Sequence, residues 1–211
     1  MNEEVIQVTV SRGATALEVA RTRFNDYAPL LPLQRYSDAR TLLHRSLAVF
    51  ESAGDTEDLG NVHSALANLE DELQHFQEAV RHESASLRLE YSALLPQKCA
   101  ISHHNLAIYL TRTNADARLA LAHGLASVLI SYQTNDGELP GRLNAVRLHL
   151  ARVSPSDPPA SFDELCRLVE QTEGVHFREL FSRLPQRAAS GDEALRTVLE
   201  MARAPEPPPA L

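Results

Sequence analysis

Cysteine and histidine residues that could bind a metal ion lie close together near residue 100. Cys99 and His103 are four residues apart, a spacing that places two side chains on one face of a helix, and His104 follows directly. His63 occupies the position 40 residues before His103. A structural zinc site needs about four such ligands, so this set is incomplete. We expect no metal and no other cofactor, and instead a packed, hydrogen-bonded pair formed by His63 and His103.

Three consecutive acidic residues, Glu70, Asp71 and Glu72, could supply paired carboxylates for acid–base chemistry. Consecutive residues on a helix point in different directions, so we interpret this run as a solvated helix face. The sequence contains no Gly-x-Ser-x-Gly, His-Glu-x-x-His, glycine-rich phosphate loop or Cys-x-x-Cys motif. Cys166 lies on an apolar stripe, where it is expected to be a small core residue. The sequence therefore predicts a protein without catalytic residues, not an enzyme.

A pattern with a period of 40 residues occurs twice between Gly60 and Tyr132. Val-His-Ser-Ala-Leu-Ala at 62–67 aligns with Ser-His-His-Asn-Leu-Ala at 102–107, and each copy continues into a second apolar-periodic run. Such a period with no strand signal indicates helical hairpins, each with an apolar face that the next hairpin covers. Aromatic residues make up only 5% of the chain and Trp is absent, so the core must consist of Leu, Ala and Val. We therefore predict an all-α fold.

Breaks in composition divide the chain into five segments. They are an N-terminal lead-in (1–13), helical repeats (14–153), a proline-rich break (154–160), a C-terminal helical cap (161–203) and a disordered tail (204–211). The β-branched run from Val5 to Val10 is expected to be an extended lead-in or the remnant of an upstream domain. The last helix of the repeats should run from Leu139 to Val153 with Leu148 directed inward. Gly191 and Asp192 are expected to cap the final helix.

The charge and cysteine content exclude several classes of partner and location. The net charge of −8 gives no electrostatic reason to bind nucleic acid or an anionic membrane surface. Two cysteines are too few for a disulfide framework, and no long apolar run indicates a signal peptide or a membrane span. We expect a cytoplasmic protein. Lys98 is the only lysine among the basic residues, and this arginine bias, with abundant Ala and Leu, is typical of a bacterial, GC-rich genome.

The helix pairs resemble the tetratricopeptide repeat (TPR) family. The positions that carry the resemblance are Leu66, Ala67, Phe76, Ala79 and Leu87 in one copy, Leu106 and Ala107 in the next, and Tyr36, Ala39 and Leu47 in a degenerate first copy. Leu119 departs from the pattern, because a small residue is expected there. The period of 40 also exceeds the usual value of about 34 residues. The resemblance spans residues 14–134 and implies a right-handed α-solenoid of antiparallel hairpins with a C-terminal helical cap.

In the TPR family the first helix of each pair lines a concave groove. The corresponding positions here are Asn61, Ser64, Asn68, Asp71, Glu72, His104, Asn105, Ile108 and Arg112. Asn, Asp and Arg side chains can hold a peptide backbone through directional hydrogen bonds, although such residues also occur on helix faces that bind nothing. A carboxylate-binding groove is disfavoured, because Lys98 is expected in a turn and Asp71 and Glu72 are acidic. A neutral or basic partner suits this charge.

The resemblance implies a non-catalytic scaffold or adaptor that binds a peptide or helix of another protein in this groove. An alternative is a regulatory or sensor module, such as a fragment of a larger multidomain bacterial protein, that controls an effector or binds a small ligand. The expected partner is a protein or peptide, with no nucleic acid and no membrane. The oligomeric state stays open.

Overall fold

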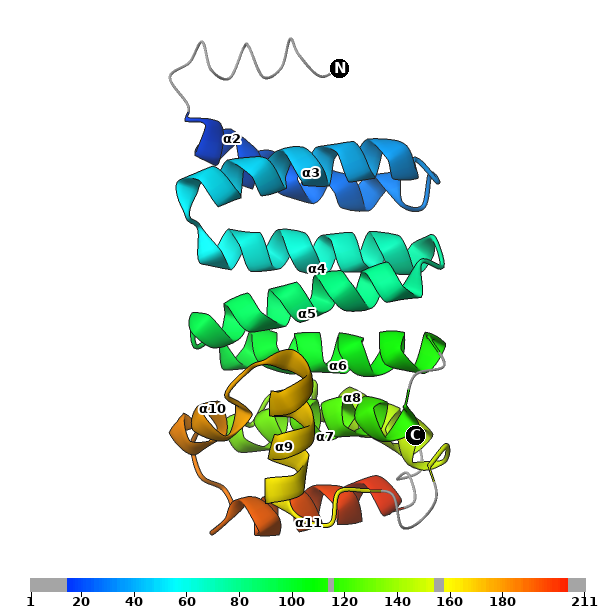
Figure 1. Ribbon diagram of the computed structural model, residues 1–211, viewed down its shortest axis with the longest axis vertical. Coiled ribbons are helices and arrows are strands. Elements are labelled where there is room, and N and C mark those ends of the chain that lie inside the picture. Colours follow the sequence, from blue (N-terminus) through cyan, green and yellow to red (C-terminus); the bar gives the residue numbers. More distant parts are fainter. Residues whose placement is uncertain (1–14, 114–115, 154–157, 205–211) are drawn as a thin grey trace, which may run out of the picture. The chain divides into compact units, whose positions relative to one another are not determined.

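The computed structural model describes residues 15–113, 116–153 and 158–204. The predicted lead-in at 1–13 and nearly all of the predicted tail lie outside these residues, as does part of the proline-rich break. Within the described residues the chain forms ten α-helices and one 3₁₀ helix, and no strand (Figure 1). The prediction of an all-α fold is therefore confirmed. By its internal contacts the chain forms two compact units, 1–93 and 94–211.

The first unit consists of helices that pack against their neighbours in the sequence. They are α2 (Ala16–Arg23), the 3₁₀ helix η1 (Phe24–Leu30), α3 (Tyr36–Ala53), α4 (Thr56–Glu72) and α5 (Phe76–Ser92). Figure 1 shows α4 and α5 lying side by side as an antiparallel pair. Gly54 ends α3 in the left-handed conformation, and the Asp55 side chain then accepts a hydrogen bond from Asp58 N at 3.1 Å to start α4. Leu43, Phe50 and Leu66 are fully buried in the core of this unit.

The second unit is organised around one buried helix. It contains α6 (Pro96–Arg112), α7 (Ala117–Thr134), α8 (Leu139–Leu150), α9 (Phe162–Glu173), α10 (Phe177–Arg183) and α11 (Gly191–Arg203). The central helix α7 carries one charged residue, Arg118, and is buried nearly all round from Ala120 to Ser131. It packs against α6, α8, α9 and α11, and α9 runs across it in Figure 1. The helices predicted as a cap thus belong to the same unit as α6–α8.

Several predicted details of the second unit are wrong. Leu148, expected to face inward, is 62% exposed, and α8 ends at Leu150. Lys98 lies in the first turn of α6 and not in a connecting turn. The last helix is capped by Ser190, whose side chain accepts from Glu193 N at 3.1 Å. Asp192 has a different role, because it accepts a hydrogen bond from Phe162 N at 2.7 Å and so ties the start of α9 to α11.

None of the described helices is both long enough and apolar enough to span a lipid bilayer.

Gly191 allows α11 to lie directly against the aromatic cluster of α9 and α10. A Cβ at Gly191 would collide with the ring of Phe162, which packs against Phe177 and Phe181. We expect Gly191→Ala to lower the free energy of unfolding by about 1–3 kcal/mol, because the ring must move within a filled core. Gly141→Ala is the matched control, since no atom lies within 4 Å of a Cβ there. Thermal unfolding of both variants tests this, and equal stability of the two would contradict it.

Candidate functional site

The two hairpins α4–α5 and α6–α7 each contain a pair of histidines, which is half-buried in the first hairpin and fully buried in the second. His63 Nδ1 lies 3.1 Å from His82 Nδ1 in the first hairpin, and His103 Nδ1 lies 2.9 Å from His123 Nδ1 in the second. Each pair joins the first helix of a hairpin to its second helix. The predicted pair of His63 with His103 is therefore wrong. The two residues occupy equivalent positions, but each bonds a histidine within its own hairpin.

A second buried contact repeats in the same two hairpins. Ser86 Oγ donates to Gly60 O at 2.8 Å, and Ser127 Oγ donates to Ala100 O at 2.6 Å. The acceptors are 40 residues apart and the donors 41 residues apart, as are His82 and His123. The hairpins are thus copies of one another in their side-chain contacts as well as in their helices. Both kinds of contact fix the axial register between the two helices of a hairpin.

The histidine pairs are neutral at neutral pH, which suits a structural role. Burial lowers the pKa of His123 to about 3, and burial together with the nearby His63 and Arg81 lowers the pKa of His82 to about 4. Burial and the adjacent His123 also place the pKa of His103 well below its ordinary value. An Nδ1–Nδ1 hydrogen bond requires one ring to carry the proton on Nδ1 and the other to accept it. Two protonated rings could not form this bond.

The cysteines that seemed able to bind metal or react are enclosed in the core. Cys99 and Cys166 are both buried, as predicted for Cys166, and burial raises the pKa of the Cys166 thiol to about 12. In the described ranges no three or more His, Cys, Asp or Glu side chains are grouped closely enough to hold a metal ion. Burial and the raised pKa therefore disfavour the Cys166 thiol as a nucleophile.

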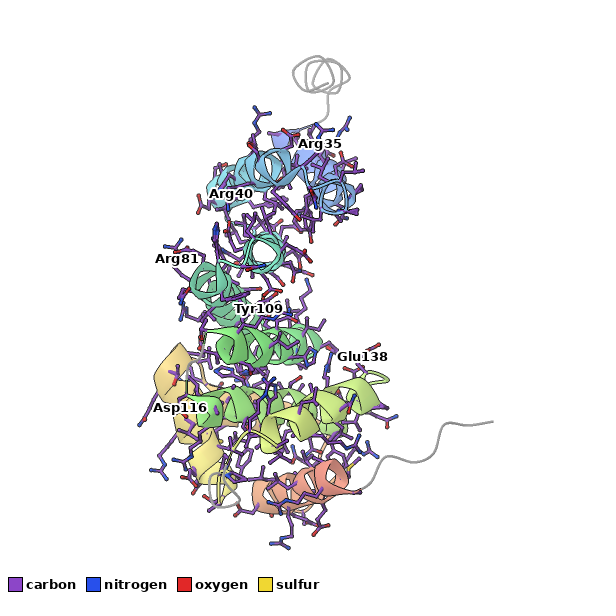
Figure 2. The ribbon with its side chains drawn as sticks, turned by 90° about the vertical axis from the view of Figure 1, so that its right-hand side faces the viewer. Arg35, Arg40, Arg81, Tyr109, Asp116 and Glu138 are labelled. Carbon is purple, nitrogen blue, oxygen red and sulfur yellow. The ribbon has the colours of Figure 1, made fainter. Side chains whose placement is uncertain are left out.

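The acidic run at the end of α4 is not a uniformly solvated face. Glu70 is buried, and both of its oxygens accept hydrogen bonds from Arg40 on α3, which Figure 2 labels, at 2.6 to 3.0 Å. His75 Nδ1 lies 2.8 Å from the same carboxylate. Asp71 is half-buried and only Glu72 is exposed. The prediction was thus wrong for Glu70, which joins α3, α4 and the turn after α4.

The predicted groove residues of the first unit form one stripe along α4. Asn61, Ser64 and Asn68 are three or four residues apart on the same face. Asn61 donates to Asp58 at 3.3 Å, and Ser64 donates to the buried Glu83 of α5 at 3.3 Å. Asn68 is exposed and hydrogen-bonds Tyr27 of η1. The structure therefore places Asn68 at the outer edge of the junction between η1 and α4.

The predicted groove residues of the second unit lie beside α8. His104, Asn105 and Ile108 are half-buried on α6, and Arg112 is exposed at its end. Thr111 Oγ1 lies 3.3 Å from His149 Nδ1 of α8. Burial, and then the charge of Arg142 on α8, lower the pKa of His104. Both helices appear in Figure 2, where Tyr109 marks α6 and Glu138 marks the residue before α8.

Sequence reasoning assigned no site to Arg142 and His149 of α8 or to Arg152, which follows α8. Arg142, His149 and Arg152 become neighbours of α6 only through the packing of three helices at Gly124. A Cβ at Gly124 would lie 3.2 Å from Val146 and 3.4 Å from His149 of α8, and 3.9 Å from Ala107 of α6. One signal was available in the sequence, because neither 96–112 nor 139–153 contains an acidic residue.

No protein-family model, curated protein or solved structure matches this chain. Its function must therefore be inferred from the α4 stripe (Asn61, Ser64 and Asn68) in the first unit and the predicted groove residues of α6 in the second.

Glu70 should contribute stability that depends on pH. Burial alone would raise its pKa, but the hydrogen bonds from His75 and Arg40 and their charges outweigh burial, and the pKa is lowered. The carboxylate therefore stabilises the fold above its unfolded pKa of 4.5, and this contribution is lost as the pH falls through the lower folded pKa. We expect Glu70→Gln to reduce the unfolding free energy at pH 7 by about 1 kcal/mol, since the partly exposed Arg40 is screened by solvent.

Glu72→Gln provides the matched control, because Glu72 is exposed in the same turn. Its effect should stay within about 0.5 kcal/mol. Urea unfolding at pH 7 and pH 3.5 measures both variants. The interpretation of Glu70 fails if Glu70→Gln matches wild type at pH 7, or if its deficit is the same at pH 3.5.

Proposed function

We propose that this chain is a non-catalytic scaffold built from TPR-like hairpins, and that it binds a segment of another polypeptide on the outer face of α4. The hairpins use their paired histidines and their buried serines to bond their own helices, so these groups serve the fold. The polar residues of the α4 stripe lie outside the core. The observation that carries the proposal is this stripe of hydrogen-bonding side chains beside η1.

Two contacts join the α4 stripe to the first helical segment of the same unit. Arg21 of α2 forms ion pairs with Asp55 and Asp58 at the start of α4, and Tyr27 bonds Asn68 near its end. The segment before α3, formed by α2 and η1, therefore lies beside α4, the helix before α5, along much of its length. In a TPR-like solenoid these are the segments that line the concave side. A peptide lying along α4 would meet Asn61, Ser64 and Asn68 in turn, and the amides can donate to and accept from a peptide backbone.

The charge of α4 favours a neutral or basic segment. The helix contains five acidic residues and no basic residue. Arg21 and Arg40 offset the charges of Asp58 and Glu70, whereas Glu72 is exposed at the end of the stripe. A lysine or arginine of the partner would be attracted to this end, and an acidic partner would be repelled.

Selection of a displayed library of random 12-residue peptides against the full chain tests this function. We expect the selection to yield neutral or basic peptides that bind the wild-type chain. A synthetic copy of a selected peptide should bind the Asn68→Ala variant about 3- to 10-fold more weakly than it binds wild type, as expected for one lost hydrogen bond. Glu72→Lys should weaken a basic peptide by a similar factor. Fluorescence anisotropy measures each dissociation constant.

Two controls separate binding from folding. Gln77→Ala removes an exposed amide from α5 in the same unit and should leave the affinity unchanged. Tyr27→Phe removes the intramolecular partner of Asn68 but leaves the amide in place, so affinity should be retained. If every selected peptide binds Asn68→Ala and Glu72→Lys as tightly as wild type, α4 is not the binding surface.

A further inference from the structure

The histidine pair of the first hairpin has the spacing of two ligands of one metal ion. His63 Nδ1 of α4 lies 3.1 Å from His82 Nδ1 of α5. Imidazole nitrogens bind Zn²⁺ at about 2.0–2.1 Å, so two nitrogens on one ion, at an angle of about 90–110°, are about 2.9–3.4 Å apart. The two Nδ1 atoms fall within this range. The residues are 19 positions apart in the sequence, so the folded hairpin is what brings them together.

Access to solvent distinguishes this pair from its copy in the second hairpin. His63 and His82 are half-buried, whereas His103 and His123 are fully enclosed, and the ring of His103 packs edge-on against Phe177 with centroids 5.9 Å apart. To bind an ion, each ring must turn so that both Nδ1 lone pairs point to one position beside the N···N line. Partial exposure leaves the first pair room for this turn and lets water reach the ion. The enclosed pair has neither.

The protonation state of the first pair also suits a metal ligand. Burial lowers the pKa of His63, and burial together with the charges of His63 and Arg81 lowers the pKa of His82 to about 4. Both rings are therefore neutral at neutral pH, which is the form that binds metal. The hydrogen-bonded pair holds one proton on Nδ1. Transfer of this proton to Nε2 of the same ring frees both Nδ1 atoms without charging either ring.

Charged side chains around the pair favour a cation at His63 and are mixed at His82. They are three carboxylates, Glu51, Glu70 and Glu78, and two guanidinium groups, Arg81 and Arg88. At His63 the carboxylate of α3, Glu51, has a larger effect than the opposing arginine. At His82 the two other carboxylates are opposed by the arginine that precedes it in the chain. A bound cation would therefore be attracted most strongly on the His63 side.

We propose that His63 and His82 bind one divalent transition-metal ion through their Nδ1 atoms, and that the ion links α4 to α5. The described residues supply no third protein ligand, so water fills the remaining positions. The site is thus open, unlike a closed structural zinc site with four protein ligands. Cu²⁺ should bind most tightly, because affinity at a nitrogen site rises from Ni²⁺ to Cu²⁺ and falls again at Zn²⁺.

The inference goes beyond the proposed function and does not depend on it. Asn68→Ala, which tests the peptide site on α4, leaves both histidines in place and should bind the ion as tightly as wild type. Loss of the peptide result would therefore leave the metal site standing, and loss of the metal result would leave the peptide site standing.

Isothermal titration calorimetry of the full chain, free of any affinity tag, with CuCl₂ alone tests the proposal. We expect one ion per chain and weaker binding of ZnCl₂. The electron paramagnetic resonance spectrum of the Cu²⁺ form should show two nitrogen ligands. His63→Gln and His82→Gln should each weaken binding by at least about 10-fold, because each removes one of the two protein ligands. The Gln amide can still hydrogen-bond the remaining imidazole, so the hairpin should stay folded.

The matched controls are His44→Gln and His176→Gln, which each remove an exposed histidine. They should change the affinity less than about 2-fold. The inference is overturned if the wild-type chain binds no Cu²⁺, if either control weakens binding as much as His63→Gln, or if the spectrum shows a single nitrogen ligand. Thermal unfolding without metal verifies that each variant is folded before the titration.

Discussion

The fixed register between the two helices of each hairpin is the constraint on which the rest of this structure depends. Interdigitated Ala and Leu side chains already disfavour sliding, because a shift would open voids in a close-packed interior. A buried hydroxyl or imidazole tolerates no such slip, since an unpaired polar group in the core costs about 1–3 kcal/mol. The contacts of Ser86 with Gly60 O and of His63 with His82 therefore select one alignment, and their equivalents at Ser127 and His103 select the same alignment again.

The two hairpins share these internal contacts but differ in the side chains that they expose. Once the register is fixed, the outward positions of the first helix no longer contribute to the core and are free to vary. In α4 they are amides and carboxylates, whereas in α6 they include Ile108 and Arg112 and no carboxylate. The buried position of Glu83 in the first hairpin corresponds to Gly124 in the second, where the missing side chain admits α8. The change from Glu83 to Gly124 at one buried position thus accompanies a new neighbouring helix, α8, and an outer face on α6 that lacks carboxylates.

The sequence predicts helices better than it predicts their partners. Helix limits depend on residues nearby in the chain. The side chains of Asp55 and Ser161 accept hydrogen bonds from Asp58 N and Glu164 N at the starts of α4 and α9, and Pro96 is the first residue of α6. Which side chains pair across two helices depends on how the helices cross. A sequence period of 40 residues carries no information about that crossing. For this reason His82 and His123 were not recognised as partners.

The buried role of Glu70 was missed for a related reason. Its arginine partner lies on α3, 30 residues away in the sequence, so the acidic run could not show which of its members was enclosed. The packing of α8 beside α6 was equally hidden, since α8 reaches α6 only by packing over α7 at Gly124. The absence of acidic residues from both helices is the one sequence signal that could have indicated it.

Nitrogen-15 NMR of the histidine side chains in the full chain tests most directly whether internal polar pairs fix the hairpins. For each of the pairs His63–His82 and His103–His123 we predict one ring protonated on Nδ1 and one with a bare Nδ1 acceptor, with each of the four rings titrating below the ordinary histidine pKa because burial lowers their pKa values. If all four histidines titrate near 6.5 with the tautomer typical of exposed imidazoles, the hairpins are not fixed in this way and the outward faces assigned to α4 and α6 lose their basis.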